Sequence, residues 1–292
     1  MPNLGIDLGG TKIEAVLLAD DGQTIKRKRI PTKSSDGYDA IVTRITNLVN
    51  ELLPLAENID HIGICTPGAI EPTKGVLKNS NTICLIGKPL QEDLEKQIGL
   101  SVFMENDANC FALSEASFGA AQGYNVVFGV IMGTGIGGGI VINKKIHNGP
   151  NNIAGEWGHH SIYPNGRMCY CGNKGCVETY ISGPALEKEW FELTGENQIV
   201  TDIVKNGLIK KHAEWKERFI LNFGRALSHV IDIIDPDCIV MGGGLSKVDM
   251  LYSEGRDAVY AEIFSEHVVT PILKNKLGDS AGVFGAALLG DK

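Results

Sequence analysis

Cysteine and histidine residues crowd into one short stretch of the chain, and their spacing is typical of a metal site. The histidines are His159 and His160, and the thiols belong to Cys169, Cys171 and Cys176. Three thiolates and one imidazole make a closed tetrahedral zinc site that leaves no coordination position for a substrate. We therefore expect a structural Zn²⁺ that orders a loop of about 25 residues. The spacing alone does not decide which histidine is the ligand.

An alternative interpretation of the same residues is a set of reduced thiols at the protein surface. The chain has seven cysteines, and three of them lie within eight residues. In a reducing compartment, an odd number with such crowding favours a metal over disulfides. Glu156 and Glu178 flank the cluster. They either line a cleft, where they would accept hydrogen bonds from substrate hydroxyls, or are solvated surface charges.

Three glycine-rich turns each follow directly after an apolar segment. Glycine lets backbone N–H groups approach phosphate oxygens and permits positive φ, and a threonine hydroxyl adds a donor. A single turn of this kind is equally well explained as a tight hairpin, but three indicate binding of nucleotide phosphates. The candidates are Asp7, Gly9, Gly10, Thr11 and Lys12 in the first turn, Gly133, Thr134, Gly135 and Gly137 in the second, and Gly242, Gly243 and Gly244 in the third. In the first turn, Asp7 can hold Mg²⁺ through a water molecule.

A Glu-Asn-Asp sequence, Glu105–Asp107, stands where a predicted strand meets a predicted helix. Ligands of α/β proteins bind at such strand ends. Phosphoryl transfer to a hydroxyl needs a carboxylate that accepts the hydroxyl proton, and Asp107 fits that role. Asn106 can hydrogen-bond a neighbouring hydroxyl. An aspartate at a helix start is also a common N-cap, and its position alone does not separate the two roles.

The expected elements place these residues at strand ends. Strands are expected at 3–8, 14–19, 24–30, 61–68, 101–106, 126–133, 139–146 and 238–244, and helices at 38–56, 91–99, 107–120, 213–234 and 282–289. Residues 147–183 read as a polar loop. Two blocks each begin with an apolar strand, a Gly/Thr turn and a returning strand, which suggests a duplicated two-lobed α/β protein with a central cleft.

Bulk properties exclude several classes of protein. The 292 residues carry a net charge of −8 and give a pI of about 5.4, so general nucleic-acid binding is not expected. No basic segment followed by an apolar run opens the chain, and no run of 18 or more apolar residues occurs. We expect a cytoplasmic protein that does not bind membranes.

Taken together, these residues resemble the ROK family, named for repressors, open reading frames and kinases. The resemblance runs along nearly the whole chain and includes the segments Asp7–Lys12, Glu105–Asn109, Val130–His159, Cys169–Glu178 and Gly242–Gly244. It implies the two-lobed actin-like ATPase fold shared with hexokinases. We expect a small lobe of residues 1–115, completed by a helix at 281–292, and a large lobe of residues 116–280 with a zinc loop at 155–180.

The resemblance also implies roles for individual residues. Asp107 would be the catalytic base, and the sugar contacts would be Asn106, Asp107, Glu156, His159 and Glu178. It favours His159 over His160 as the zinc ligand, with the other side of that imidazole facing the sugar. It further implies ATP with Mg²⁺ and a homodimer. Repressors of the family carry an N-terminal helix-turn-helix, whereas here the phosphate turn starts at residue 5, so we expect a kinase.

The choice of sugar depends on local resemblance. The segments at 75–82, 155–159 and 169–172 are most similar to bacterial fructokinases of the family, and the remainder, including 109–115, is similar to N-acetylglucosamine kinases. The loop at 67–70, with Gly68, is expected against the second carbon of the sugar. We expect D-fructose to be converted to fructose 6-phosphate. The alternatives are a 6-kinase for N-acetylglucosamine, glucose or mannose, and a non-catalytic sugar-responsive regulator.

Overall fold

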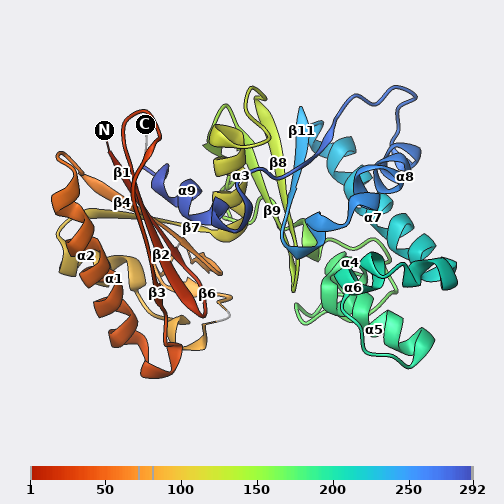
Figure 1. The fold of residues 1–292 in the computed structure, drawn as a ribbon, viewed down its shortest axis with the longest axis horizontal. Helices are drawn as coiled ribbons and strands as arrows, with labels where there is room; N and C mark the ends of the chain where they lie inside the picture. The colour runs from red at the N-terminus through yellow and green to blue at the C-terminus, as the bar shows by residue number, and fades with distance from the viewer. Residues whose placement is uncertain (1, 72, 81, 291–292) are drawn as a thin grey trace. The chain divides into compact units, whose positions relative to one another are not determined.

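Two compact units make up the chain. The computed structural model describes residues 2–71, 73–80 and 82–290. The first unit comprises Met1–Ser114, Asn148–Ile153 and Asp279–Lys292, and the second comprises Glu115–His147 and Ala154–Gly278. Each unit is built on a five-stranded mixed sheet (Figure 1), which confirms the predicted α/β class. The segment 148–153, which the expected lobes assigned to the large lobe, belongs to the first unit.

The sheet of the first unit has three parallel strands and two antiparallel ones. Its order is β3 (Thr24–Pro31), β2 (Lys12–Leu18), β1 (Asn3–Leu8), β4 (His61–Thr66) and β7 (Ser101–Asn106). The strands β1, β4 and β7 run parallel, and β2 and β3 return antiparallel beside β1. A small separate hairpin pairs β5 (Ala69–Ile70) with β6 (Leu77–Lys78).

Helices cover both faces of this sheet. Figure 1 shows α1 (Tyr38–Leu52) and α2 (Leu90–Ile98) on one side and α9 (Ala281–Ala287) on the other. The predicted apolar face of α1 is buried, and α2 ends at Gly99, which has φ 78°. Contact of α9 with the sheet depends on glycine, because a Cβ at Gly63 would lie 1.7 Å from the Ala286 carbonyl oxygen.

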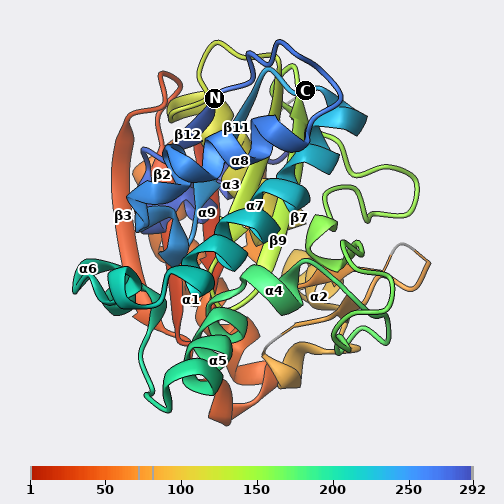
Figure 2. The same cartoon turned by 90° about the vertical axis from the view of Figure 1, so that its right-hand side faces the viewer.

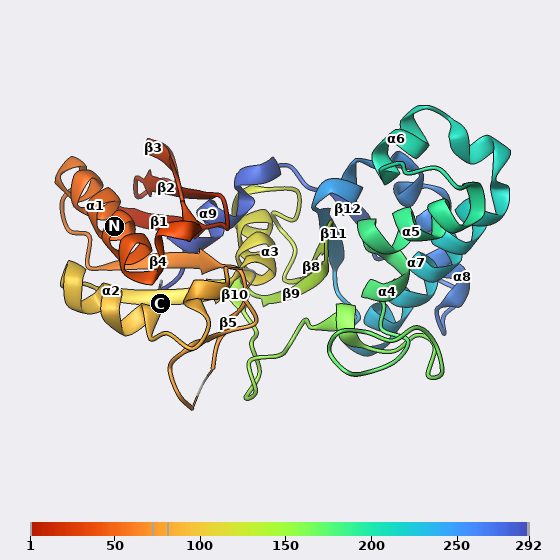
Figure 3. The ribbon, with the colours of Figure 1, turned by 90° about the horizontal axis from the view of Figure 1, so that it is seen from below.

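The second unit pairs β10 (Lys145–Ile146), β9 (Ile136–Ile142), β8 (Val126–Met132), β11 (Cys238–Gly242) and β12 (Ile272–Lys274), in that order. Its helices are α4 (Glu178–Ile181), α5 (Gly183–Thr194), α6 (Val200–Lys205), α7 (Ala213–Ile234) and α8 (Glu254–Glu262). Figure 2 shows α7 and α8 side by side, and Figure 3 shows α4, α5 and α7 gathered together. The helix α3 (Asp107–Phe118) begins in the first unit and ends in the second.

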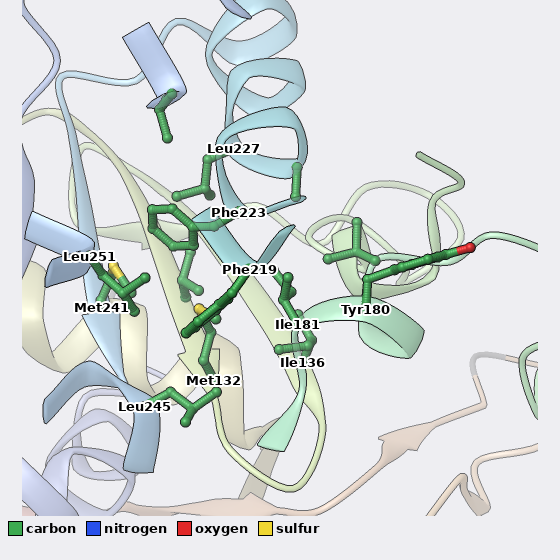
Figure 4. Packing of buried hydrophobic residues seen from close by; sticks show 14 of the residues in the cluster. Met132, Ile136, Tyr180, Ile181, Phe219, Phe223, Leu227, Met241, Leu245 and Leu251 are labelled. Carbon is green, nitrogen blue, oxygen red and sulfur yellow. The ribbon is translucent and has the colours of Figure 1, made fainter. Parts of the chain in front are cut away.

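The core of the second unit is built on one face of α7. Phe219, Phe223 and Leu227 point from α7 toward Met132 and Met241 of the sheet (Figure 4), and all five are buried. The apolar spacing predicted this helix with the bounds that the structure has. Asp235 ends it in the left-handed region, directly before Pro236.

The sequence patterns failed at a few elements. The strand predicted at 139–146 exists and pairs with β8, but its bounds are wrong, since β9 begins at Ile136, opposite Met132, and ends at Ile142. Asn143 and Lys144 have positive φ and separate β9 from β10. The helices α5, α6 and α8 were not predicted. One residue of the segment 75–82, Asn81, lies outside the residues that the structure describes.

Among the described residues, no helix is long and apolar enough to cross a membrane.

Candidate active site and metal cluster

One edge of the first sheet gathers candidate residues from three parallel strands. Asp7 lies near the end of β1, and Gly68 lies in the loop directly after β4. Asn106 is the last residue of β7, and Asp107 follows it as the first residue of α3. Parallel strands end at the same edge, so these residues from distant parts of the sequence are neighbours. Gly68 has φ 94°, and a Cβ there would lie 2.3 Å from the Lys78 carbonyl oxygen, so the loop requires glycine.

The helix cap at the end of β7 is made by Asn106. Its Oδ1 accepts a hydrogen bond from the Asn109 backbone N–H at 2.7 Å, the bond of an N-cap residue. Asp107 is the first residue of α3 and is exposed, and its Oδ1 accepts the neighbouring Ala108 N–H at 2.8 Å. Capping of α3 is therefore explained by Asn106 and does not require Asp107.

A network behind Asn106 fixes this strand end. The Glu105 carboxylate accepts hydrogen bonds from Asn109 Nδ2 at 3.0 Å and from Asn148 Nδ2 at 2.6 Å. Asn109 Nδ2 also donates to Asn148 Oδ1 at 3.0 Å. These bonds explain why the segment 148–153 belongs to the first unit.

Asp7 has an unusual charge environment. Burial raises the pKa of its carboxyl to about 6; Asp107 and Glu14 act in the same direction, and Lys12 and the Cys65 thiol act against them. Cys65 is fully buried and is the strand partner of Asp7. A buried carboxyl with a raised pKa becomes charged more readily when a divalent cation lies beside it, so Asp7 fits the expected Mg²⁺ site.

The first glycine turn is closed by backbone bonds. The Gly9 N–H donates to the Lys12 carbonyl at 2.9 Å, and the Thr32 hydroxyl donates to the Gly9 carbonyl at 2.6 Å. Gly10 and Thr11 form its tip. Behind the turn, Glu14 is fully buried and forms ion pairs with residues of β3.

Glu14 itself was not predicted from the sequence. Burial acts to raise the pKa of its carboxyl, but hydrogen bonds from Arg27 and Arg29 lower it overall. The alternating charged residues of β3 supply these partners and are the only sequence signal for the buried carboxylate.

The second and third glycine turns meet at one edge of the second sheet. A Cβ at Gly133 would lie 3.8 Å from the Gly244 nitrogen. Gly243 has φ 80°, and a Cβ there would lie 2.3 Å from the Met132 carbonyl oxygen, so only glycine fits. Thr134 stands at the tip of the second turn, and Gly242 ends β11. The two turns thus form one continuous backbone surface.

The predicted sugar-binding residue Glu178 contacts the second turn. Its Oε2 accepts the Ile136 N–H at 2.8 Å and would lie 2.9 Å from a Cβ at Gly135. Trp157 docks on the same hairpin, because its Nε1 donates to the Gly137 carbonyl at 2.9 Å. The neighbouring Glu156 is exposed, and Glu178 is half-buried at the start of α4.

The predicted metal ligands lie together in the second unit. Ligand atoms of His159, Cys169, Cys171 and Cys176 are all within 4.8 Å of one another. The Cys171 and Cys176 sulfurs are 3.7 Å apart, and His159 Nδ1 is 3.6 Å from the Cys169 sulfur. A zinc ion with Zn–S bonds of about 2.3 Å and a Zn–N bond of about 2.0 Å has tetrahedral edges of about 3.8 and 3.5 Å. The donor set therefore fits zinc, and burial of Cys169 and Cys176 argues against three surface thiols.

The two adjacent histidines have separate surroundings. His160 hydrogen-bonds the Trp157 carbonyl through Nδ1 at 2.6 Å and His229 Nδ1 through Nε2 at 3.0 Å, and it is not in the cluster. His159 directs Nδ1 toward the cluster and Nε2 toward the Tyr170 hydroxyl at 3.1 Å.

Tyr170 is a candidate functional residue that the sequence reasoning missed. Burial raises the pKa of its hydroxyl, and so do the nearby carboxylates of Glu178 and Glu156. The hydroxyl is thus close to three predicted sugar contacts, although 83% of the residue is exposed. The only sequence signal is an aromatic residue between two metal-ligating cysteines.

Known proteins match this chain over nearly its whole length. The ROK family model matches residues 3–292. An N-acetyl-D-glucosamine kinase of Haemophilus influenzae (strain 86-028NP) is 36% identical over 299 residues, covering 98% of this chain and 98% of that protein.

Solved structures are similar over the same extent. A ROK hexokinase from Thermus thermophilus gives a TM-score of 0.89 at 29% identity, covering 99% of this chain and 97% of that one. A ROK family glucokinase from Streptomyces griseus, solved in complex with glucose and AMPPNP, gives 0.76 at 29% identity and covers 99% of both chains.

Proposed function

The chain belongs to the ROK family, and we propose that it phosphorylates a primary hydroxyl of a hexose, with N-acetylglucosamine as the sugar. It is an ATP-dependent sugar kinase of that family, given the full-length matches to kinases. The residue roles and the choice of sugar are the proposal.

The N-cap at the end of β7 is the observation that carries the assignment of the base. A cap role was the competing explanation for Asp107, and the capping bond comes from Asn106 instead. An exposed carboxylate at the ends of parallel strands, beside Asp7, supports a role in proton transfer.

In the proposed mechanism, Asp107 accepts the proton of the sugar hydroxyl while the oxygen of that hydroxyl forms a bond to the γ-phosphorus of ATP. The bond from that phosphorus to the bridging oxygen breaks, and ADP leaves. The backbone N–H groups of the three glycine turns bind phosphate oxygens of ATP, and the Asp7 carboxylate would hold the Mg²⁺ ion that accompanies these phosphates. When bound, Mg²⁺ supplies positive charge that neutralises the phosphates.

A structural zinc ion is part of the proposal. The spacing of the four donors around His159 supports it, and no coordination position remains for a substrate. The ion would fix the loop that carries His159 and Tyr170, so that His159 Nε2 and the Glu156 and Glu178 carboxylates present hydrogen-bonding groups to sugar hydroxyls. The Tyr170 hydroxyl would then be displaced by a hydroxyl of the sugar or join its hydrogen bonds.

N-acetylglucosamine is proposed because several relatives of about 36% identity that span the whole chain carry that name. Fructose is the second candidate, since the Gly-Glu-Trp-Gly-His and Cys-Tyr-Cys-Gly segments, including Tyr170, resemble fructokinases of the family. A coupled assay of ADP release with N-acetylglucosamine, fructose, glucose and mannose separates the candidates. The proposal expects the largest kcat/KM for the amino sugar, and a larger value for fructose would replace it.

Replacement of Asp107 tests the base. Asp107→Ala should lower kcat by at least about 100-fold, while the circular dichroism spectrum stays unchanged. The matched control is Asp279→Ala, which changes an acidic residue of the same unit outside the proposed site. A near-normal kcat in Asp107→Ala would reject Asp107 as the base. If the unaltered protein turned over no sugar but bound a partner in a sugar-dependent way, a non-catalytic regulator would be favoured instead.

A further inference from the structure

A cavity of about 510 Å³ in the second unit is lined by none of the proposed catalytic, nucleotide, sugar or metal residues. Its walls come from the loop after the metal histidine, from α4 and α5, and from α7. The volume lies in the range of cavities that bind small molecules.

Charge in this cavity centres on one shared carboxylate. Glu189 is 7% exposed and accepts a hydrogen bond from Arg167 at 2.9 Å and another from Arg218 Nε. Two guanidinium groups therefore share a single carboxylate, and the cavity keeps a net positive charge in a chain whose net charge is −8. An anionic ligand would complete the neutralisation.

Hydrogen-bonding groups that face the cavity are donors. Asn222 lines the cavity and is 6% exposed, and its Oδ1 accepts the Tyr163 hydroxyl at 2.7 Å. The Tyr180 oxygen accepts the Arg167 backbone N–H at 2.9 Å, so its own proton is available. In the described part of the chain, no hydrogen bond occupies Asn222 Nδ2, the Tyr180 proton or the terminal nitrogens of Arg218. Such a set suits an acceptor-rich oxyanion.

The remaining walls are apolar and aromatic. The rings of Tyr163 and Tyr180 lie 4.8 Å apart, and Pro164 and Leu221 extend the surface. Figure 4 shows Tyr180 and Ile181 on α4; both belong to the hydrophobic core of this unit, and Tyr180 also lines the cavity. The two rings are already partly covered, since the Arg167 guanidinium lies over the Tyr180 ring at 4.6 Å and that of Arg225 over the Tyr163 ring at 5.0 Å.

We propose that this cavity is a second ligand site that binds a phosphorylated sugar, with the phosphate on Arg218, Asn222 and Tyr180 and the sugar against the apolar side chains of Pro164 and Leu221. The choice of a hexose phosphate among phosphorylated molecules rests on the proposed function, because such a molecule is the product of the reaction. The position of the cavity, lined by other residues, distinguishes it from the site of that reaction.

The test is a calorimetric titration of hexose 6-phosphate into the full-length protein. The active site is first saturated with the preferred sugar and a non-hydrolysable ATP analogue, so that only a second site remains. The expected result is saturable binding of N-acetylglucosamine 6-phosphate or fructose 6-phosphate, weaker binding of inorganic phosphate, and no binding of the unphosphorylated sugar.

Arg218→Gln is the decisive variant. Arg167 still pairs with Glu189 in it, so the fold is retained, and hexose 6-phosphate should bind at least tenfold more weakly than to the unaltered protein. The control Lys188→Gln removes a nearby exposed charge of α5 that does not line the cavity, and should bind normally.

Three results would overturn the inference. They are no binding once the active site is saturated, equal binding to Arg218→Gln, and a change of sedimentation coefficient in that variant without a change in binding. The last would make the cavity an interface between copies. The two proposals can fail separately. If the protein phosphorylates no sugar, hexose 6-phosphate is titrated without the sugar and the ATP analogue; binding that is lost in Arg218→Gln would then leave the second site standing while the kinase proposal fails.

Discussion

At the scale of single residues, the proposed role of Asp7 would connect stability to function. Its carboxyl is held among groups that favour its neutral form, chiefly through burial and the neighbouring Asp107. Binding of a nucleotide with its cation requires the charged form. A buried carboxylate whose charge is disfavoured by burial is stabilised when a cation binds beside it.

The pH dependence of stability tests this arrangement. The folded protein holds the Asp7 proton with a pKa of about 6, against 3.8 for the ordinary group. The folded state therefore binds this proton more tightly than the unfolded chain. The contribution of Asp7 to stability is fully present below about pH 4 and is lost as the pH rises through about 6.

Asp7→Asn should raise the free energy of unfolding at pH 8 by about 1–3 kcal/mol and leave it nearly unchanged at pH 4. The same variant should lower kcat/KM for MgATP. Urea unfolding at both pH values and steady-state kinetics measure the two effects. A variant that is equally destabilised at both pH values would contradict this assignment of charge.

At the scale of elements, the loop between Trp157 and α4 brings His159 together with Cys169, Cys171 and Cys176, the ligands of the proposed zinc ion. Gly175 shows how tightly it closes, with φ 75° and a Cβ that would lie 1.7 Å from the Tyr163 carbonyl oxygen. The same loop carries His159 and Tyr170 on one side and lines the 510 Å³ cavity on the other. Removal of the metal should therefore affect both stability and ligand binding.

Removal of zinc by a chelator should lower Tm by at least about 5 °C and raise the sugar KM about tenfold or more. Metal analysis of the purified protein and kinetics before and after chelation provide the measurement. Cys171→Ser should reproduce the effect, and Cys84→Ser, a thiol outside the cluster, should not. An unchanged sugar KM in protein shown to be free of zinc would break the connection between loop and site.

Prediction of elements from the sequence succeeded where one periodic pattern dominated. The long apolar stripe of α7 gave its bounds, and Gly99 ended α2 as expected. It failed for the start of β9, where Ile136 is followed by three glycines that carry no strand pattern. It also failed for Tyr170 and for the cap of Asn106, because both depend on hydrogen bonds whose geometry no residue spacing specifies.

At the scale of the whole molecule, two separate hydrophobic cores stabilise the chain. One consists of buried residues between Leu4 and Val102, and the other of residues between Phe128 and Ile272. The family resemblance led to a two-lobed fold, but the assignment of 148–153 to the first unit depends on the side chain of Asn148 and could not be read from composition.

Separate cores predict separate responses to core mutations. Leu48→Ala, in the first core, should cost about 2–5 kcal/mol and lower amide-exchange protection mainly in β1, β2 and β4. Phe223→Ala, in the second core, should lower protection mainly in β8, β11 and α7. Amide hydrogen exchange measured by mass spectrometry tests whether each substitution lowers protection in one unit alone. An equal loss of protection throughout both units would contradict the prediction and mean that the chain unfolds as one cooperative unit.

The contact of α9 with β1 and β4 has a consequence for how the chain is synthesised. Ribosomes release the N-terminus first, but the sheet made by the first residues lacks its cover until the last ones emerge. At about 5–20 residues per second, the second unit is translated in full while the first waits. The folding order in the cell would then run opposite to the order of synthesis, and the uncovered face of β1 and β4 would be the surface on which a nascent-chain chaperone acts.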